Sequence, residues 1–272
     1  MSKIAVVMSV YKNDVPIYLE CAINSIINQT YQNIKLFIMV DGRVDNDLLS
    51  ILDKYKPHEK IVIYKRDNNY GLAHSLNELI DTVLLEKDYK YIARMDSDDE
   101  SLPFRLCEQV QFMEQNLDID VVGSYCHEFG SEFALNIKKV PLDHERLVEY
   151  TFYKCPFIHP TVMFRANIFL DNRIRYPIET KLSEDLALWF LLLINDFRFA
   201  NINKVLLNYR IDDSTLSRRS GMKKALSEVK LRFDFARKMK RTPLEIYLLI
   251  FARGVFALCP NNVKKMMYKR WR

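Results

Sequence analysis

The sequence predicts an α/β protein in which a mostly parallel β-sheet is flanked by helices, with a basic helical extension at the carboxyl end. Over the first 95 residues, apolar segments of strand length alternate with segments that carry apolar residues at helical spacing. Polar residues gather directly after these apolar segments. The composition, with 49% hydrophobic residues, 28% charged residues and only six glycines, is typical of a globular domain and argues against a disordered chain.

The first half of the chain has the order β-α-β-α-β-α-β. The predicted strands cover Lys3–Val10, Lys35–Val40, Lys60–Lys65 and Tyr89–Met95. The helices between them are predicted to begin at Pro16, near Asp47 and near Leu72. Ligands of such folds bind at the carboxyl ends of the strands. The polar residues found there are Tyr11, Asp41, Asn69, Gly71, Asp96 and Asp98.

The second half continues the alternation less regularly. We predict a helix over about Pro103–Gln115, a strand over Val121–Tyr125, and a strand, a turn and a helix between 126 and 151. A loop from Cys155 enters a strand that ends at Arg165. A strongly apolar helix follows Ser183-Glu184-Asp185, and Lys204–Arg210 is the last predicted strand. No Gly-x-Gly-x-x-Gly or Gly-Lys-Ser/Thr loop is present, so neither a dinucleotide fold nor a P-loop is expected.

The cysteine pattern and the apolar runs indicate a cytoplasmic protein. The five cysteines are scattered and form no Cys-x-x-Cys pair, which favours a reducing compartment over a disulfide framework or a zinc site. The apolar run near the amino terminus is too short for a secretory signal. No apolar run reaches the roughly 18 residues of a membrane-spanning helix.

The carboxyl-terminal residues 222–272 differ in charge from the rest. They hold 14 Lys/Arg and 3 Asp/Glu, whereas the first 221 residues hold 26 and 32. We expect a charged helix over Met222–Lys240, an apolar helix over Leu244–Leu258, and a basic end that includes Tyr268 and Trp271. Cations interleaved with aromatic residues favour an anionic membrane surface. The alternative is a helical hairpin packed on the body with solvated lysines; nucleic acid is not expected, because the acidic body would oppose it.

Three aspartates within four positions follow the fourth predicted strand. Asp96, Asp98 and Asp99 come directly after an apolar run. Two carboxylates about 4 Å apart repel by ~4 kcal/mol at an effective dielectric near 20, so three of them require a counter-charge. A divalent cation with a phosphate-bearing ligand supplies it. The alternative is that Asp98, Asp99 or Ser101 caps the next helix, which has Pro103 in its first turn; the two roles are compatible.

From Lys3 to Arg210 the chain resembles the inverting family-2 glycosyltransferases with the GT-A fold, a group that includes bacterial O-antigen and capsule sugar transferases. The resemblance rests on several short motifs in a fixed order, and their combination is specific although each is weak alone. They are Ser9-Val10-Tyr11, Ser25 to Tyr31, Val40-Asp41-Gly42, Asn69 to Ala73, Met95 to Asp99 with Pro103 and Arg105, His159 to Met163, and Glu184-Asp185.

The resemblance implies roles for the nucleotide-binding positions. Asp41 is expected to accept the uracil N–H, with Val10 and Tyr11 lining the base. The family often has two acids before the glycine, and here Val40 stands in the first position. Asn69 and Gly71 are expected beside the nucleotide, where glycine lets the backbone approach closely; a plain helix-start turn is the alternative. Of the acid cluster Asp96, Asp98 and Asp99, one carboxylate is expected on the ribose, and Asp98 or Asp99 on Mn²⁺ or Mg²⁺.

The resemblance also implies the catalytic base. Asp185 is expected to take the proton of an acceptor hydroxyl as that oxygen attacks the sugar; without the resemblance, Asp185 or Ser183 would be interpreted as a helix cap. His159 is expected beside the donor, on the diphosphate or the metal, with a structural histidine as the alternative. The family's histidine after Tyr209-Arg210 is absent, and Arg218 and Arg219 could close over the diphosphate instead.

Together these features predict an inverting, metal-dependent hexosyltransferase. It would move glucose, galactose or an N-acetyl form from a UDP-sugar to an undecaprenyl-diphosphate-linked or other lipid-linked saccharide, on the inner face of the inner membrane. Residues 1–100 would bind the nucleotide-sugar, 101–221 would bind the acceptor and carry the base, and 222–272 would contact the membrane. A sugar-1-phosphate nucleotidyltransferase is the alternative, but its glycine-rich basic loop is missing; a non-catalytic nucleotide-sugar-binding protein is another.

Overall fold

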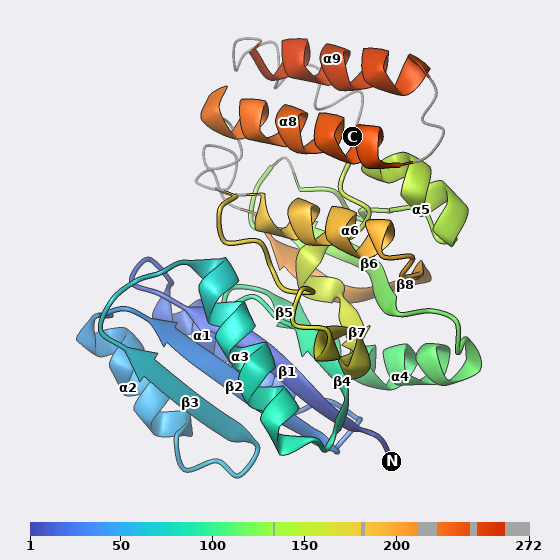
Figure 1. The fold of residues 1–272 in the computed structure, drawn as a ribbon. Coiled ribbons are helices and arrows are strands. Elements are labelled where there is room, and N and C mark those ends of the chain that lie inside the picture. The colour runs from blue at the N-terminus through green and yellow to red at the C-terminus, as the bar shows by residue number, and fades with distance from the viewer. Residues whose placement is uncertain (133, 181–182, 212–221, 240–243, 259–272) are drawn as a thin grey trace.

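The computed structural model describes residues 1–272 except 133, 181–182, 212–221, 240–243 and 259–272 (Figure 1). One eight-stranded sheet runs through the described residues in the order β3-β2-β1-β4-β7-β6-β8-β5. The predicted Arg218, Arg219, Tyr268 and Trp271 fall outside the described part, so the structure does not bear on them.

The first half forms the predicted alternation of parallel strands and helices. The strands are β1 (Lys3–Val10), β2 (Ile34–Asp41), β3 (Ile61–Arg66) and β4 (Tyr89–Arg94). β1 pairs in parallel with β2 and β4, and β2 pairs in parallel with β3. The helices are α1 (Pro16–Ile27), α2 (Asn46–Tyr55) and α3 (Leu72–Glu86). These bounds confirm the prediction to within about a residue. β1 and β2 are apolar runs that are buried almost throughout, whereas the edge strand β3 is mostly half-buried.

The second half of the sheet mixes directions. β7 (Met163–Arg165) lies antiparallel between β4 and β6 (Val121–Phe129), and β8 (Phe199–Arg210) pairs in parallel with β6. The two-residue edge strand β5 (Glu100–Ser101) pairs with the end of β8. The prediction missed β5 and began β8 five residues late. Asn201 lies inside β8, and its buried side-chain NH2 group donates to the carbonyls of Pro141 and Pro156, so the donors of a residue typical of loops are paired within the sheet.

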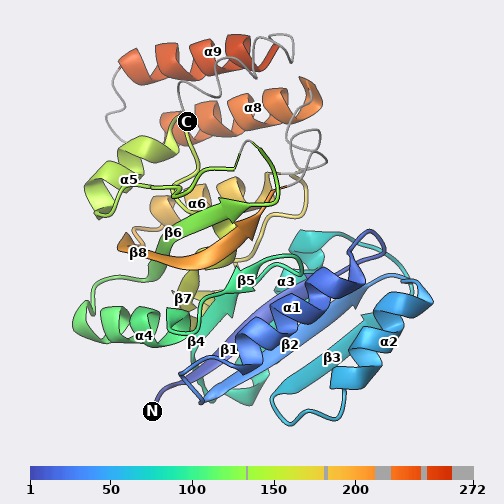
Figure 2. The same cartoon turned by 180° about the vertical axis from the view of Figure 1, so that it is seen from behind.

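Helices cover both faces of the sheet. α1, α2 and α4 (Arg105–Gln115) pack on one face, seen in front in Figure 2. α3, α5 (His144–Thr151) and α6 (Glu184–Ile194) pack on the other. Two short 3₁₀ turns, His159–Thr161 and Ala166–Leu170, flank β7. The aromatic residues of the second face converge on Trp189 of α6, which contacts the rings of Phe157, Phe164 and Phe199.

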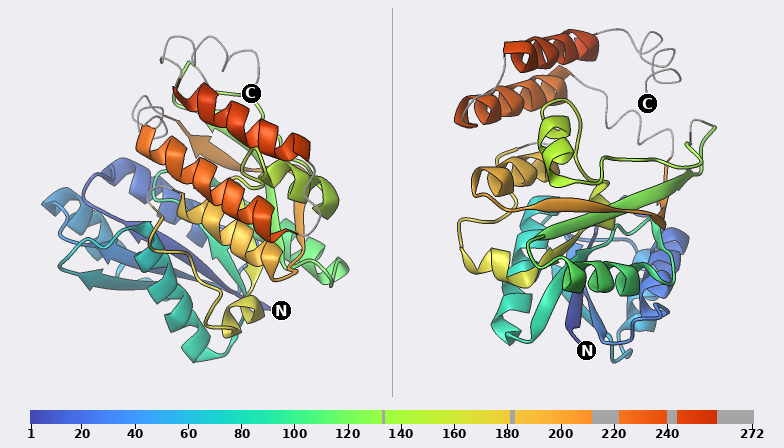
Figure 3. Two further views of the ribbon diagram at one scale, coloured as in Figure 1. Left: turned by 45° about the horizontal axis from the view of Figure 1, so that its top comes forward. Right: turned by 90° about the vertical axis from the view of Figure 1, so that its right-hand side faces the viewer.

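The carboxyl-terminal helices form two further layers. α8 (Met222–Lys238) packs on α6, and α9 (Leu244–Leu258) packs on α8, so that α6, α8 and α9 are stacked in that order (Figure 3). The Phe235 ring of α8 stacks on Phe190 with centroids 4.2 Å apart and lies 5.0 Å from Phe152. α8 is therefore part of the core of the second face. No helix among the described residues is both long enough and apolar enough to cross a membrane.

Candidate active site

The three aspartates after β4 converge on one point. Asp96, Asp98 and Asp99 each offer a carboxylate oxygen, and these oxygens all lie within 4.8 Å of one another. β4 ends at Arg94, and the backbone N–H of Met95 still bonds to Val7 of β1, so the cluster begins where the strand pairing stops. Carboxylate oxygens at this spacing are the ligands that Mg²⁺ and Mn²⁺ prefer.

Asp99 is the buried member of the cluster. Its side chain is 0% exposed, and its Oδ1 accepts a hydrogen bond of 2.8 Å from the backbone N–H of Arg210. Its Oδ2 is buried and has no hydrogen-bond partner among the described residues. Burial first, and then the charges of Asp96 and Asp98, raise the pKa of Asp99 well above its usual range. A buried carboxylate oxygen without a donor is stabilised by a cation, so the cluster fits a divalent metal.

Two buried arginines lie beneath the cluster. The guanidinium of Arg94, 1% exposed, forms an ion pair with Asp96. Arg105 is the first residue of α4, and its Nη2 donates to the backbone carbonyl of Arg94 at 2.7 Å. Burial lowers the pKa of Arg105 to about 9, so it is still a cation at neutral pH. These two cations offset part of the repulsion among the aspartates and allow the cluster to form in the folded chain.

Arg210, at the end of β8, bonds to two residues of the cluster. Its Nε donates to the backbone carbonyl of Asp98 at 2.9 Å, in addition to the bond from its backbone N–H to Asp99. Its guanidinium lies 3.7 Å from the ring centroid of Tyr18 and 4.3 Å from that of Phe129. Cation–π contacts on both sides restrict the rotamer of Arg210. The loop that carries Asp98 and Asp99 is therefore fixed by a residue more than a hundred positions away.

Asp41 ends β2 and is almost fully paired. Its carboxylate, 3% exposed, accepts from Arg66 Nε at 2.8 Å and from the backbone N–H of Tyr70 at 2.9 Å on Oδ1. Oδ2 accepts from the backbone N–H of Gly71 at 2.7 Å. A carboxylate oxygen has about two lone-pair sites, so Oδ2 keeps capacity for one further donor. The arrangement can bind a ligand N–H.

The other predicted nucleotide-binding residues surround Asp41. The side-chain amide of Asn69 donates to the Asp41 carbonyl at 2.9 Å. Gly71 has φ +94°, a conformation that strains any residue with a Cβ, and this conformation aims its N–H at Asp41. Tyr11 follows β1 and is half-buried, with its N–H bonded to Asp14 at 3.0 Å. Val10 is fully buried in the core beneath them.

Asp185 is the second residue of α6. It is half-buried; its Oδ1 accepts from the N–H of Leu186 at 2.7 Å, and its Oδ2 accepts from the thiol of Cys155, with Sγ 3.7 Å away. Burial first, and then the Asp185 charge, raise the pKa of Cys155, so this thiol stays protonated and remains a donor. Ser183 stands before the helix, and its hydroxyl makes no cap hydrogen bond. A positioned carboxylate at this place can accept a proton.

The pKa of Tyr176 depends on acids from both groups, the cluster and Asp185. It is buried, and reciprocal hydrogen bonds of 2.9 Å join its backbone to the side chain of Asn77 on α3. Burial raises the pKa of Tyr176, and the charges of both Asp185 and Asp96 raise it further, so both carboxylates lie close enough to influence it. Acids from both groups that the sequence singles out therefore act electrostatically on the same tyrosine.

His159 belongs to this region but not to the acid cluster. Its Nε2 shares a hydrogen bond of 3.0 Å with the hydroxyl of Tyr176, and its ring packs edge-on to Trp189 with centroids 6.0 Å apart. Burial, and then Arg94, lower the pKa of His159 well below its usual range, so the ring is neutral. Among the described residues, the group whose ligand atoms are close enough together to bind one metal ion consists of the three aspartates. A metal role for His159 stays a prediction.

A model of the family described as "Glycosyl transferase family 2" matches residues 5–173. The chain belongs to glycosyl transferase family 2. It is 30% identical over 272 residues to an Escherichia coli UDP-Gal:alpha-D-GlcNAc-diphosphoundecaprenol beta-1,3-galactosyltransferase, covering 98% of this chain and 96% of the relative. It is also 34% identical over 221 residues to the O-antigen biosynthesis glycosyltransferase WbnJ of Escherichia coli, covering 79% and 82% of the two chains.

Solved structures confirm the GT-A fold of this family 2 protein. S. aureus TarS in complex with UDP has a TM-score of 0.67 at 16% identity and covers 91% of this chain and 69% of its own. The mannosyltransferase PcManGT from Pyrobaculum calidifontis, in complex with GDP-Man and Mn²⁺, has a TM-score of 0.65 at 15% identity and covers 94% and 70%. At these identities the likeness extends to the fold alone.

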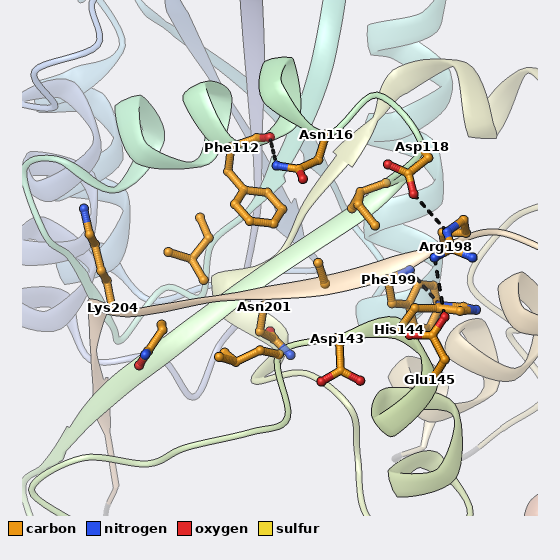
Figure 4. Close-up of a pocket in the computed structure, with 15 residues that line it drawn as sticks. Phe112, Asn116, Asp118, Asp143, His144, Glu145, Arg198, Phe199, Asn201 and Lys204 are labelled. Atoms are coloured by element: carbon orange, nitrogen blue, oxygen red, sulfur yellow. Dashed lines mark hydrogen bonds and ion pairs between the residues drawn. The ribbon is translucent and has the colours of Figure 1, made fainter.

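A groove lies at the end of β8 that is opposite the aspartate cluster. It has a volume of about 560 Å³ and lies between α4, the start of β8 and the start of α5 (Figure 4). The charged residues around it are paired: Arg198 with Asp118 at 3.1 Å and with Glu145 at 3.6 Å, and Lys204 with Glu108 at 2.7 Å. β8 runs from this groove to the acid cluster at its opposite end, so the groove is not the site of the aspartates.

The sequence predicted the acids of this family 2 site but not their basic partners. Arg66, Arg94 and Arg210 were given no role, although each bonds directly to one of the predicted aspartates or its backbone. Tyr176 was also missed. One signal was available: Arg94 stands at the end of an apolar run and directly before the acids, where a charged residue needs a buried partner.

Proposed function

We propose that this family 2 protein is an inverting hexosyltransferase that uses a UDP-sugar and a divalent metal to glycosylate a lipid-linked saccharide. The observation that carries the proposal is the cluster of Asp96, Asp98 and Asp99 after β4, whose carboxylate oxygens lie within 4.8 Å of one another. Electrostatics add to it, because the charges of Asp96 and of Asp185 on α6 both raise the pKa of Tyr176. The curated relatives that act on a diphosphoundecaprenol-linked sugar or in O-antigen synthesis support the substrate class.

The donor nucleotide would lie across the ends of β1, β2 and β4. Asp41 Oδ2 has capacity for one more donor and would accept the uracil N3–H, with Tyr11, Asn69 and Gly71 around the base and Val10 beneath. Asp96 would face the ribose, and Asp98 and Asp99 would hold Mn²⁺ or Mg²⁺. A bound divalent ion stabilises the charge that develops on the leaving diphosphate. The UDP and GDP-Man/Mn²⁺ complexes of structural neighbours support both the nucleotide and the ion.

Asp185 would act as the general base. Its carboxylate takes the proton from the acceptor hydroxyl as that oxygen forms a bond to the anomeric carbon. The bond from the anomeric carbon to the diphosphate oxygen breaks on the opposite face, UDP leaves with the bonding electrons, and the anomeric configuration inverts. The Cys155 thiol and the Leu186 N–H hold the carboxylate in place. The neutral His159–Tyr176 pair would form the wall beside the sugar.

The proposed setting is the inner face of the bacterial inner membrane, with residues 222–272 against the lipid. The excess of 14 Lys/Arg over 3 Asp/Glu in this segment supports attraction to anionic headgroups. A lipid-linked acceptor requires the enzyme to work at a membrane surface.

The proposal is tested by replacing the base. Asp185→Asn should keep UDP affinity within about twofold and lower UDP release in the presence of an acceptor by about 10²–10⁴-fold, the range for loss of general base catalysis. Asp196→Asn is the matched control, because it makes the same change at the exposed far end of α6 and at a positive φ that asparagine tolerates. Calorimetry with UDP and a UDP-release assay measure the two effects. Near-normal turnover of Asp185→Asn refutes the assignment.

A further inference from the structure

The outward face of α9 is apolar. Leu244, Leu248 and Phe251 are 76%, 63% and 65% exposed. Their spacing of four and seven residues places them on one side of the helix. Ile246 and Ile250, on the opposite side, are 8% and 0% exposed and pack toward α8. A single exposed leucine needs no explanation, but three large apolar side chains over two turns of one helix form a surface that a partner would cover.

α9 is attached to the body through α8 and not through a loose linker alone. Tyr247 of α9 packs on Phe233 of α8 with ring centroids 5.7 Å apart. On its other side, α8 inserts Phe235 between Phe190 and Phe152. The buried guanidinium of Arg232 donates to the backbone carbonyl of Thr151 at the end of α5. The outward face of α9 therefore has a fixed direction relative to α6 (Figures 1 and 3).

The charges around this face favour one kind of partner. Lys230, Arg237 and Lys238 are exposed on the neighbouring helix α8. The sequence after Leu258 adds five Lys/Arg and no Asp/Glu within 14 residues. A second copy of the chain would bring a like-charged segment against this one. Apolar side chains bordered by cations complement a surface with acyl chains inside and anionic headgroups outside.

We infer that the outward face of α9 docks on an anionic lipid bilayer, and that α8 is a rigid spacer that sets the height and direction of α6 above the lipid. Two successive helix separations of 8–10 Å place the axis of α6 roughly 20 Å from that of α9. The saccharide head of a membrane-embedded acceptor would then meet the end of α6 that carries Asp185. This inference deepens the membrane setting of the proposed function and takes the role of Asp185 from it; the binding of vesicles can be measured without any sugar transfer.

Flotation with phosphatidylcholine vesicles that contain a quarter phosphatidylglycerol tests the docking. Leu248→Ser with Phe251→Ser should lower the partition coefficient of the full chain by about tenfold or more, since two apolar side chains no longer enter the lipid. The matched control is Ile17→Ser with Leu117→Ser, 56% and 74% exposed elsewhere on the surface, which should partition like the parent. Pure phosphatidylcholine vesicles should bind the parent weakly, because the anionic headgroups are absent.

A second pair of measurements separates this inference from the proposed function. With a soluble acceptor on a short alkyl chain, the α9 double variant should turn over like the parent; with the acceptor embedded in vesicles it should be slower by the same factor as its partition. Unchanged partition of the α9 variant overturns the docking, and so does a parent dimer that the α9 variant dissociates, which would assign the face to a second copy. If neither the parent nor the α9 variant releases UDP from any UDP-sugar, but the variant still binds vesicles more weakly than the parent, the docking stands and the proposed sugar transfer fails.

Discussion

Asp41 and Asp99 are both buried aspartates at strand ends of the same sheet, but their surroundings differ. Asp41 accepts hydrogen bonds from a guanidinium and from two backbone N–H groups. Asp99 accepts one bond, from the backbone of Arg210, and its Oδ2 has no partner among the residues that the structure describes. Both carboxylate oxygens of Asp41 thus have a partner within the protein, whereas in the described part of the chain only one oxygen of Asp99 has one.

This difference indicates what each region recognises. A carboxylate that is already paired and rigid suits a neutral ligand that offers one N–H in a fixed direction. A buried carboxylate beside two others, with an unpaired oxygen, suits a cation, because only a positive charge offsets both the lost hydration and the mutual repulsion. Burial raises the pKa of Asp99, which is the physical sign that the site is unsatisfied without a ligand. Three changes test this contrast.

The largest effect should come from removing the unsatisfied acids. Asp98→Asn together with Asp99→Asn keeps the size of both side chains and removes two charges. Loss of outer partners alone weakens metal sites by about 10–100-fold, so loss of two ligands should reduce Mn²⁺-dependent UDP affinity by more than about 100-fold. Calorimetry with UDP, with and without Mn²⁺, measures it. Asp47→Asn with Asp53→Asn, on two exposed acids of α2, should leave the affinity unchanged; equal metal dependence in both double variants would contradict the assignment.

The next effect should come from breaking the satisfied region. Arg66→Met removes the guanidinium from Asp41 and leaves two backbone donors in place. Because the carboxylate remains buried and partly unpaired, the free energy of unfolding should fall by about 2–3 kcal/mol, measured by urea denaturation. Arg43→Met is the control, since Arg43 pairs with Asp67 at 3.8 Å on the exposed surface. A change below about 0.5 kcal/mol at Arg66 would mean that Asp41 needs no cation.

The smallest effect should be a pH dependence from Asp99. Its folded-state pKa lies above the unfolded value, so the folded chain keeps a proton that the unfolded chain loses in the window between the two. Stability of the metal-free protein should therefore fall as pH rises through that window, by at most ~1.4 kcal/mol per pH unit for one proton. Urea unfolding between pH 5 and 8 should show a flatter profile for Asp99→Asn, and Mn²⁺ with UDP should restore the parent at the upper end. Identical slopes for parent and Asp99→Asn would contradict this.

The sequence predicted most of the first half of the fold, and it singled out the acids of the candidate site, whose roles stay predictions. β1 and β2 are mainly apolar runs, and β3 and β4 are short apolar segments with few charged residues, all between polar turns; local patterns of that kind are sufficient to find them. β8 was predicted too short because Asn201 is satisfied by carbonyls 60 and 45 positions away. The arginines were missed for the same reason: Arg66 and Arg210 meet Asp41 and Asp99 across separations of 25 and 111 residues. No spacing rule reports such contacts.

The two cation–π contacts of Arg210 also bear on the order in which parts of this protein fold during its synthesis. The loop that carries the three clustered aspartates ends within the first hundred residues. The guanidinium that fixes it comes from position 210 and contacts the rings of residues 18 and 129. A nascent chain that has left the ribosome only as far as residue 150 would contain every acid of the cluster and still lack its clamp. Nucleotide binding should thus emerge late in synthesis, and a truncated amino-terminal fragment should not serve as a miniature donor-binding module.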